Sequence, residues 1–152
     1  MASWREIEER APELAERAWA LFGLDKHKTV ATLRRDGSPR ISGTELELVD
    51  GDLWMGSMEN AVKALDLRRD ARFALHSMAP EATWSGDAKI AGRAEESFDP
   101  EAKAKIVGEG SQAHAFRLDV AELVVVRLGE PADHLLIESW HEGRGLSSLR
   151  RD

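Results

Sequence analysis

The sequence contains no cysteine and no tyrosine, and it has only five prolines in 152 residues. Without cysteine, the chain has no disulfide, no thiol nucleophile and no thiolate ligand for a metal or an iron–sulfur cluster. No apolar run approaches the roughly 18 residues that a membrane span requires. The N-terminal residues MASWREIEERAPE are acidic and amphipathic, and they lack the apolar core of a signal peptide. The sequence therefore predicts a cytoplasmic protein that does not associate with membranes.

Basic residues are fewer than acidic ones: the sequence has 21 lysines and arginines and 28 aspartates and glutamates, for a net charge of −7. Nucleic acids and anionic membranes are bound by neutralising phosphates with lysine and arginine. The charge balance therefore argues against either partner, although a local basic pocket remains compatible with it. The length suits one domain with a proper core, and we expect a single domain over residues 1–152, with a helical segment at 1–23.

Local signals define the elements that this domain contains. Ser3 and Glu6 have the spacing of a capping box, and Pro12 suits the first turn of a helix that ends at Gly23. Strand-like runs occupy residues 29–34, 40–49, 53–56, 71–77, 87–95, 116–127 and 134–140, and further helices are predicted at 60–69, capped by Asn60, and at 100–107. Asp-Gly turns and even spacing favour a mainly β protein, a small closed or partly open antiparallel barrel with flanking helices.

Lys63 lies in the first turn of the predicted helix at 60–69, where the helix dipole disfavours a cation. A bound phosphate would reverse this preference, since the lysine and the free backbone N–H groups would share one dianion, with Ser57 and Asn60 as further donors. The alternative is a solvated lysine that pairs with Asp66 along the helix.

Arg40, Ser42 and Thr44 share one face of the predicted strand at 40–49. Cross-strand neighbours could bring this face to the same anion or to a planar ring, and the alternative is a polar strand face in water. Trp54, Trp84 and Trp140 lie on or beside strands, where they would either wall a flat heterocycle or pack in the core or an interface.

The five histidines show no metal-ligand spacing, and we expect no metal site. The sequence also lacks a Gly-x-Ser-x-Gly elbow, a Walker loop and a dinucleotide-binding fingerprint. No side chain stands out as a general acid or base, so the catalytic residues stay unknown.

The runs TVATLRRDGSPRISG and DGDLWMGSMENAVKALDLRRDARFAL, followed later by GDAKIAGRAEES, resemble the pyridoxamine 5′-phosphate oxidase-like family of flavin-binding split β-barrel proteins. The resemblance implies a six- to seven-stranded antiparallel split barrel with a Greek-key-like order. It also implies a homodimer that binds FMN, or alternatively the deazaflavin F-420, at the subunit interface. Its cofactor-binding residues would be Arg40, Ile41, Ser42, Gly43, Thr44, Met55, Gly56, Ser57 and Lys63.

Within this resemblance, Lys63 and Arg40 would hold the cofactor phosphate, and residues 41–43 would run along the isoalloxazine ring. Glu45 stands where the authentic oxidases carry a basic residue, and Ala61-Val62-Lys63 replaces their Ser-Arg-Lys. True pyridoxamine phosphate oxidase activity is therefore not expected.

The function predicted from the resemblance is an FMN-dependent oxidoreductase acting on an unidentified small molecule. One alternative is an F-420-dependent reductase, with a basic groove formed by Arg34, Arg35, Arg68 and Arg69 for the acidic tail of that cofactor. The other alternative is a non-catalytic protein that binds flavin or haem, with His76 or His141 as candidate axial ligands for haem.

Overall fold

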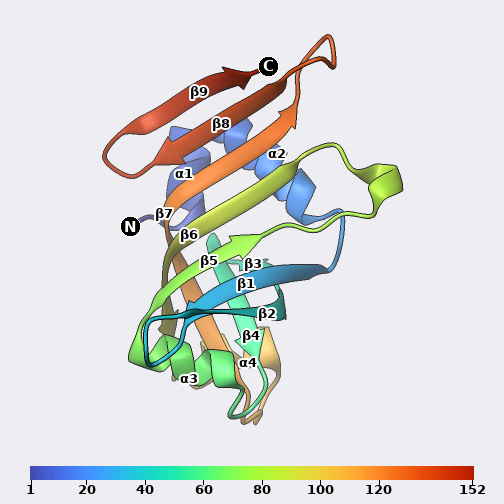
Figure 1. Cartoon of the computed structure of the whole chain (residues 1–152). Helices are drawn as coiled ribbons and strands as arrows, with labels where there is room; N and C mark the ends of the chain where they lie inside the picture. The colour runs from blue at the N-terminus through green and yellow to red at the C-terminus, as the bar shows by residue number, and fades with distance from the viewer.

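The structure is a computed structural model that describes residues 1–152, and it contains a nine-stranded antiparallel sheet flanked by helices (Figure 1). The strands are β1 (His27–Leu33), β2 (Pro39–Glu45), β3 (Glu47–Val49), β4 (Asp52–Ser57), β5 (Arg72–His76), β6 (Asp87–Glu96), β7 (His114–Leu128), β8 (Leu135–His141) and β9 (Gly145–Arg151). The helices are α1 (Trp4–Arg10), α2 (Pro12–Phe22), α3 (Val62–Arg69) and α4 (Pro100–Val107), with a 3-10 turn, η1, at Glu81–Thr83. The mainly β fold predicted from the sequence is confirmed.

The strand order is β2-β1-β5-β6-β7-β4-β3, and β8 and β9 extend the sheet from the second half of β7. The 15-residue β7 is the central strand: its start pairs with β4, its middle with β6 and its end with β8. The sheet curls until β2 and β4 lie close to each other, but no backbone ladder joins them. The barrel therefore has an open seam between these two strands.

The two N-terminal helices form as predicted. In the capping box of α1, Ser3 accepts a hydrogen bond from the Glu6 N–H at 3.3 Å and returns its own N–H to the Glu6 carboxylate at 2.7 Å. α2 packs on β6, β7 and β8, where its apolar residues join the core around Trp4, Phe22 and Phe116. None of the helices is long and apolar enough to span a bilayer.

The strand count exceeds the predicted six to seven for identifiable reasons. The predicted strand at 40–49 is interrupted at Leu46, because β2 pairs with β1 while β3 pairs with β4 at the other end of the sheet order. β9 was not predicted, since its residues are exposed and carry no apolar alternation. Asn60 is not the N-cap of α3: it adopts a left-handed φ of 57°, and Ala61 precedes the helix without a side-chain cap.

A bulge at Ala121 of β7 lies opposite Gly92 of β6. The register with β7 shifts between Ala91 and Gly92, and a Cβ at Gly92 would lie 1.9 Å from the backbone oxygen of Asp119. Only glycine permits this approach of the two strands, which explains the second glycine in GDAKIAGRA.

Candidate functional site

The open seam between β2 and β4 contains a cavity of about 420 Å³. β3 pairs with Asp52–Trp54 of β4 only, so the Met55–Ser57 end of β4 has no partner on the side of the seam. The cavity is lined by His27, Gly43, Thr44, Glu45, Glu47, Gly56, Ser57, Met58, Ala61, Lys63, Ile106, Val107 and Ala113. We call it the seam cavity. It brings together Gly43, Thr44, Gly56, Ser57 and Lys63 of the predicted site residues.

Lys63 reaches the seam cavity from the first turn of α3. Its ammonium donates a hydrogen bond to the carbonyl oxygen of Gly43 at 2.6 Å, which joins α3 to β2. Burial lowers the pKa of the Lys63 amine, and no carboxylate pairs with it. The alternative pairing with Asp66 does not form. A partly buried amine without a counter-ion is suited to receive an anionic group.

Ser57 is the second polar group of the seam cavity, at the end of β4. The residue is 6% exposed, and its hydroxyl has no hydrogen-bond partner in the protein. Buried hydroxyl groups are almost always hydrogen-bonded, and an exception calls for a ligand or water that completes the site. The position of Ser57 in the cavity wall makes it a donor or acceptor for such a ligand.

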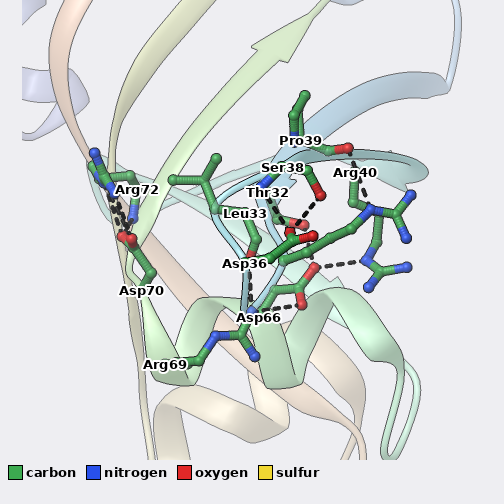
Figure 2. Close-up of polar contacts among 11 residues, drawn as sticks. Thr32, Leu33, Asp36, Ser38, Pro39, Arg40, Asp66, Arg69, Asp70 and Arg72 are labelled. Atoms are coloured by element: carbon green, nitrogen blue, oxygen red, sulfur yellow. Dashed lines mark hydrogen bonds and ion pairs between the residues drawn. The ribbon is translucent and has the colours of Figure 1, made fainter.

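Arg40 does not line the seam cavity, because it is held by a buried carboxylate. Its Nε donates to Asp66 at 2.7 Å, and Thr32 and Arg69 donate to the same carboxylate at 2.8 and 3.0 Å (Figure 2). Burial by itself raises the pKa of Asp66, but the hydrogen bonds from Arg40, Thr32 and Arg69 outweigh it and hold this pKa below its usual range. The ion pair between Arg40 and Asp66 therefore has a structural role.

A second cavity of about 550 Å³ lies on the other side of the N-terminal turn of α3. We call it the arginine cavity, since its lining consists of Arg34, Arg35, Asp36, Arg40, Val62, Leu65, Asp66 and Arg69. Val62 borders this cavity and its neighbour Lys63 borders the seam cavity, so the first turn of α3 contributes to both cavities.

The remaining predicted residues lie elsewhere. Ile41 is 73% exposed on the outside of β2, Ser42 is half-buried, and neither lines the seam cavity. The side chain of Met55 is fully buried in the core. Trp54 and Trp140 are also buried, whereas Trp84 is exposed and donates to Asp87 at 3.0 Å.

The seam cavity also contains residues that the sequence did not indicate. Ile106 and Val107 of α4 form an apolar wall, and a Cβ at Gly56 would lie 3.2 Å from Val107. Glu47 adds negative charge, as does Glu45, which the sequence had already marked as acidic where the resemblance expects a basic residue; Glu45 is paired with Lys26 at 3.3 Å. The contact between α4 and β4 is long-range, and no local pattern could have revealed it.

Solved structures of other proteins share this architecture. A pyridoxamine 5′-phosphate oxidase-related, FMN-binding protein from Nostoc punctiforme is 12% identical and superposes with a TM-score of 0.62, over 100% of this chain and 98% of the other. PhzG from Burkholderia lata, solved with tetrahydrophenazine-1-carboxylic acid, has 12% identity and a TM-score of 0.66 over 97% and 92%. A haem-binding protein from Mycobacterium smegmatis has 18% identity and a TM-score of 0.61 over 91% and 87%. The chain has the pyridoxamine 5′-phosphate oxidase-like fold.

At these identities the likeness concerns the fold alone. No family model and no curated protein matches the sequence. Proteins with this fold include FMN-binding and haem-binding members, so the ligand of this chain has to be inferred from its own residues.

Proposed function

We propose that the chain binds FMN in the seam cavity, with the phosphate at Lys63 and Ser57. The observation that carries this proposal is the coincidence, in one cavity, of an amine without a counter-ion and a buried hydroxyl without a partner. A phosphate dianion satisfies both groups, because its oxygens accept hydrogen bonds from the amine and from the hydroxyl. Arg40 would contribute through its charge from the arginine cavity, without direct contact.

The ring system would lie between β2 and β4. Gly43 and Gly56 present no side chain to this space, and the apolar wall of Ile106 and Val107 suits a planar ring. The unpaired end of β4 offers backbone groups to the polar edge of the ring. When bound, FMN supplies the electron-transfer chemistry, while the protein binds it, orients it and excludes water. The proposed activity is that of a flavin-dependent oxidoreductase on a small molecule.

We propose further that a second copy of the chain covers the seam. Ile41, Met58 and Val62 are 73%, 80% and 53% exposed, and they lie on β2 and on the segment between β4 and the start of α3. Exposed apolar side chains gathered around a site are typical of an interface. Sedimentation equilibrium should show a dimer, and an Ile41→Glu/Met58→Glu variant should be monomeric. A monomeric wild type would contradict this part of the proposal.

The decisive experiment is the absorption spectrum of the purified protein, followed by titration with FMN and with riboflavin. Lys63→Ala should weaken FMN binding about tenfold to a hundredfold, as expected for a charge-assisted hydrogen bond, and leave riboflavin binding unchanged. Lys89→Ala, at an exposed position on β6, is the matched control and should change neither. Failure of the wild type to bind any flavin would refute the proposal.

The arginine cavity supports a second candidate, the deazaflavin F-420, whose acidic tail needs a basic groove. Of the predicted groove residues, Arg34, Arg35 and Arg69 line this cavity, whereas Arg68 pairs with Glu96. Fluorescence titration with F-420 and with FMN separates the two candidates. Tight FMN binding without an F-420 response would eliminate this one.

A non-catalytic ligand-binding protein is the third candidate, favoured by the haem-binding relative in fold. Neither predicted axial ligand lines the seam cavity: His76 contacts the carbonyl of Ser77, and His141 contacts Glu122 at 2.9 Å. Haem titration, together with a test of flavin reduction by a nicotinamide or deazaflavin donor, distinguishes binding from catalysis. Bound flavin that accepts no hydride would favour a binding protein.

A further inference from the structure

A buried hydrogen-bonded network lies directly next to the phosphate end of the seam cavity. His114 begins β7 and is 6% exposed, and its Nδ1 lies 2.6 Å from the carboxylate of Glu96 on β6. Arg68 of α3 donates to both oxygens of the same carboxylate, at 2.5 and 2.9 Å. The network thus joins β6, β7 and α3, and it plays no part in the cofactor contacts proposed above.

The other imidazole nitrogen of His114 holds the backbone of the turn that follows β4. Nε2 accepts the N–H of Asn60 at 3.1 Å, and Asn60 has the left-handed φ of 57°. Because Nε2 accepts, the ring is neutral and its proton is on Nδ1, where it is donated to Glu96. The burial of Glu96 raises its pKa, but hydrogen bonds from Arg68 and His114 outweigh this effect and keep the pKa lowered, so the acceptor is a carboxylate.

The turn that His114 holds is part of the seam cavity. Met58 and Ala61 line the cavity on either side of Asn60, and the Ala61 N–H closes the turn on the Met58 carbonyl at 3.0 Å. His114 is also the cross-strand partner of Ser57. The turn therefore fixes the separation between Ser57 at the end of β4 and Lys63 at the start of α3.

We propose that His114 is a positioning residue for the phosphate half of the cofactor site, acting through the Asn60 N–H. This inference rests on the proposed function, since it concerns the same cavity. Asparagine tolerates the left-handed conformation better than most other residues, but the turn still has to be held in one geometry. The hydrogen bond from the Asn60 N–H to His114 holds it, and Glu96 and Arg68 fix the tautomer and the orientation of the imidazole.

Two substitutions separate the acceptor at Nε2 from the donor at Nδ1. His114→Gln places a carbonyl oxygen where Nε2 lies and preserves the acceptor for Asn60, whereas His114→Asn preserves only the donor to Glu96. FMN affinity should fall about tenfold in His114→Asn and stay within about threefold of the wild type in His114→Gln, in the range of one buried hydrogen bond. Riboflavin affinity should be unchanged in both variants, because riboflavin lacks the phosphate.

Equal weakening of FMN and riboflavin in His114→Asn would overturn the proposal, since it would indicate a general loss of structure. Equal FMN affinity in both variants would overturn it as well. Hydrogen exchange of the Asn60 amide is the readout that needs no flavin: it should accelerate in His114→Asn and remain slow in His114→Gln. If the wild type binds no flavin, the proposed function fails, and this exchange difference still decides whether His114 holds the turn.

Discussion

The ion-pair network of Asp66 allows a quantitative test of what holds the β1–β2 hairpin to α3. Replacement of Asp66 by asparagine keeps the shape of the side chain and removes its charge. Asp66 is almost fully buried, with a side-chain exposure of 3%, and it accepts from Arg40, Thr32 and Arg69 (Figure 2). The substitution leaves two guanidinium groups without their common counter-ion.

Removing one partner of a buried ion pair costs about 3–5 kcal/mol. The side chains of Arg40 and Arg69 are 24% and 33% exposed, so water screens part of the uncompensated charge. We therefore expect Asp66→Asn to lower the free energy of unfolding by about 2–3 kcal/mol, or the melting temperature by about 4–12 °C for a chain of this size.

Urea unfolding at neutral pH measures this loss, and Asp152→Asn is the matched control. Asp152 pairs with the Nε of Arg150 at 2.7 Å, the same distance as in the Asp66–Arg40 pair, but its side chain is 77% exposed. The control should leave the midpoint unchanged, because exposed pairs contribute little.

The pH dependence gives an independent check of the same prediction. Because the folded-state pKa of Asp66 is lowered, its stabilisation is complete above the unfolded pKa and is lost as the pH falls through the folded pKa. The difference between wild type and Asp66→Asn should therefore shrink in acid. An unchanged difference, or a loss no larger than that of Asp152→Asn, would refute the reasoning.

Three further predictions concern other parts of the molecule. Gly92→Ala should destabilise by about 2–3 kcal/mol in urea unfolding, because its Cβ meets the Asp119 backbone, whereas Gly43→Ala, with open space around it, should not. Ser3→Ala removes the α1 cap and should cost about 1 kcal/mol in the same assay. FMN affinity, titrated by fluorescence, should decline as the pH rises. The decline should occur at a lower pH than if Lys63 had the pKa of an ordinary lysine, because burial lowers the pKa of Lys63. Riboflavin affinity should not decline.

Local signals predicted most of the elements correctly. The Ser3–Glu6 box, the proline of α2 and the Asp99-Pro100 start of α4 act through contacts within a few residues, so the sequence near them is sufficient. The break at Leu46 separates the β1–β2 hairpin from the β3–β4 hairpin, and β9 pairs with its sequence neighbour β8. Residue alternation marked neither feature, because the strand-like pattern runs on through Leu46 and the residues of β9 are exposed.

In the candidate site, too, the sequence indicated some residues, whereas the roles of others depend on contacts between distant residues. Lys63 and Ser57 were indicated by their places at a helix start and a strand end, and the structure brings them to one cavity. Arg40 was indicated by the resemblance, but the charge that holds it comes from Asp66, 26 residues away. His114 gave no signal at all, because its role depends on a contact with Asn60 across 54 residues.

The central position of β7 has a consequence for the folding of the protein during its synthesis. β1 can pair with β2 and β5 within the first half of the chain. β4 can pair only with the short β3 until residues 114–118 have left the ribosome. The N-terminal segment completes its contacts later still, because the backbone of Ala2 hydrogen-bonds to that of Val120. Because domains generally fold as units once their chain has emerged, the cavity between β2 and β4 takes shape only late in synthesis. Nascent chains halted before β7 should therefore be open to proteases and chaperones, whereas those released after it should resist digestion.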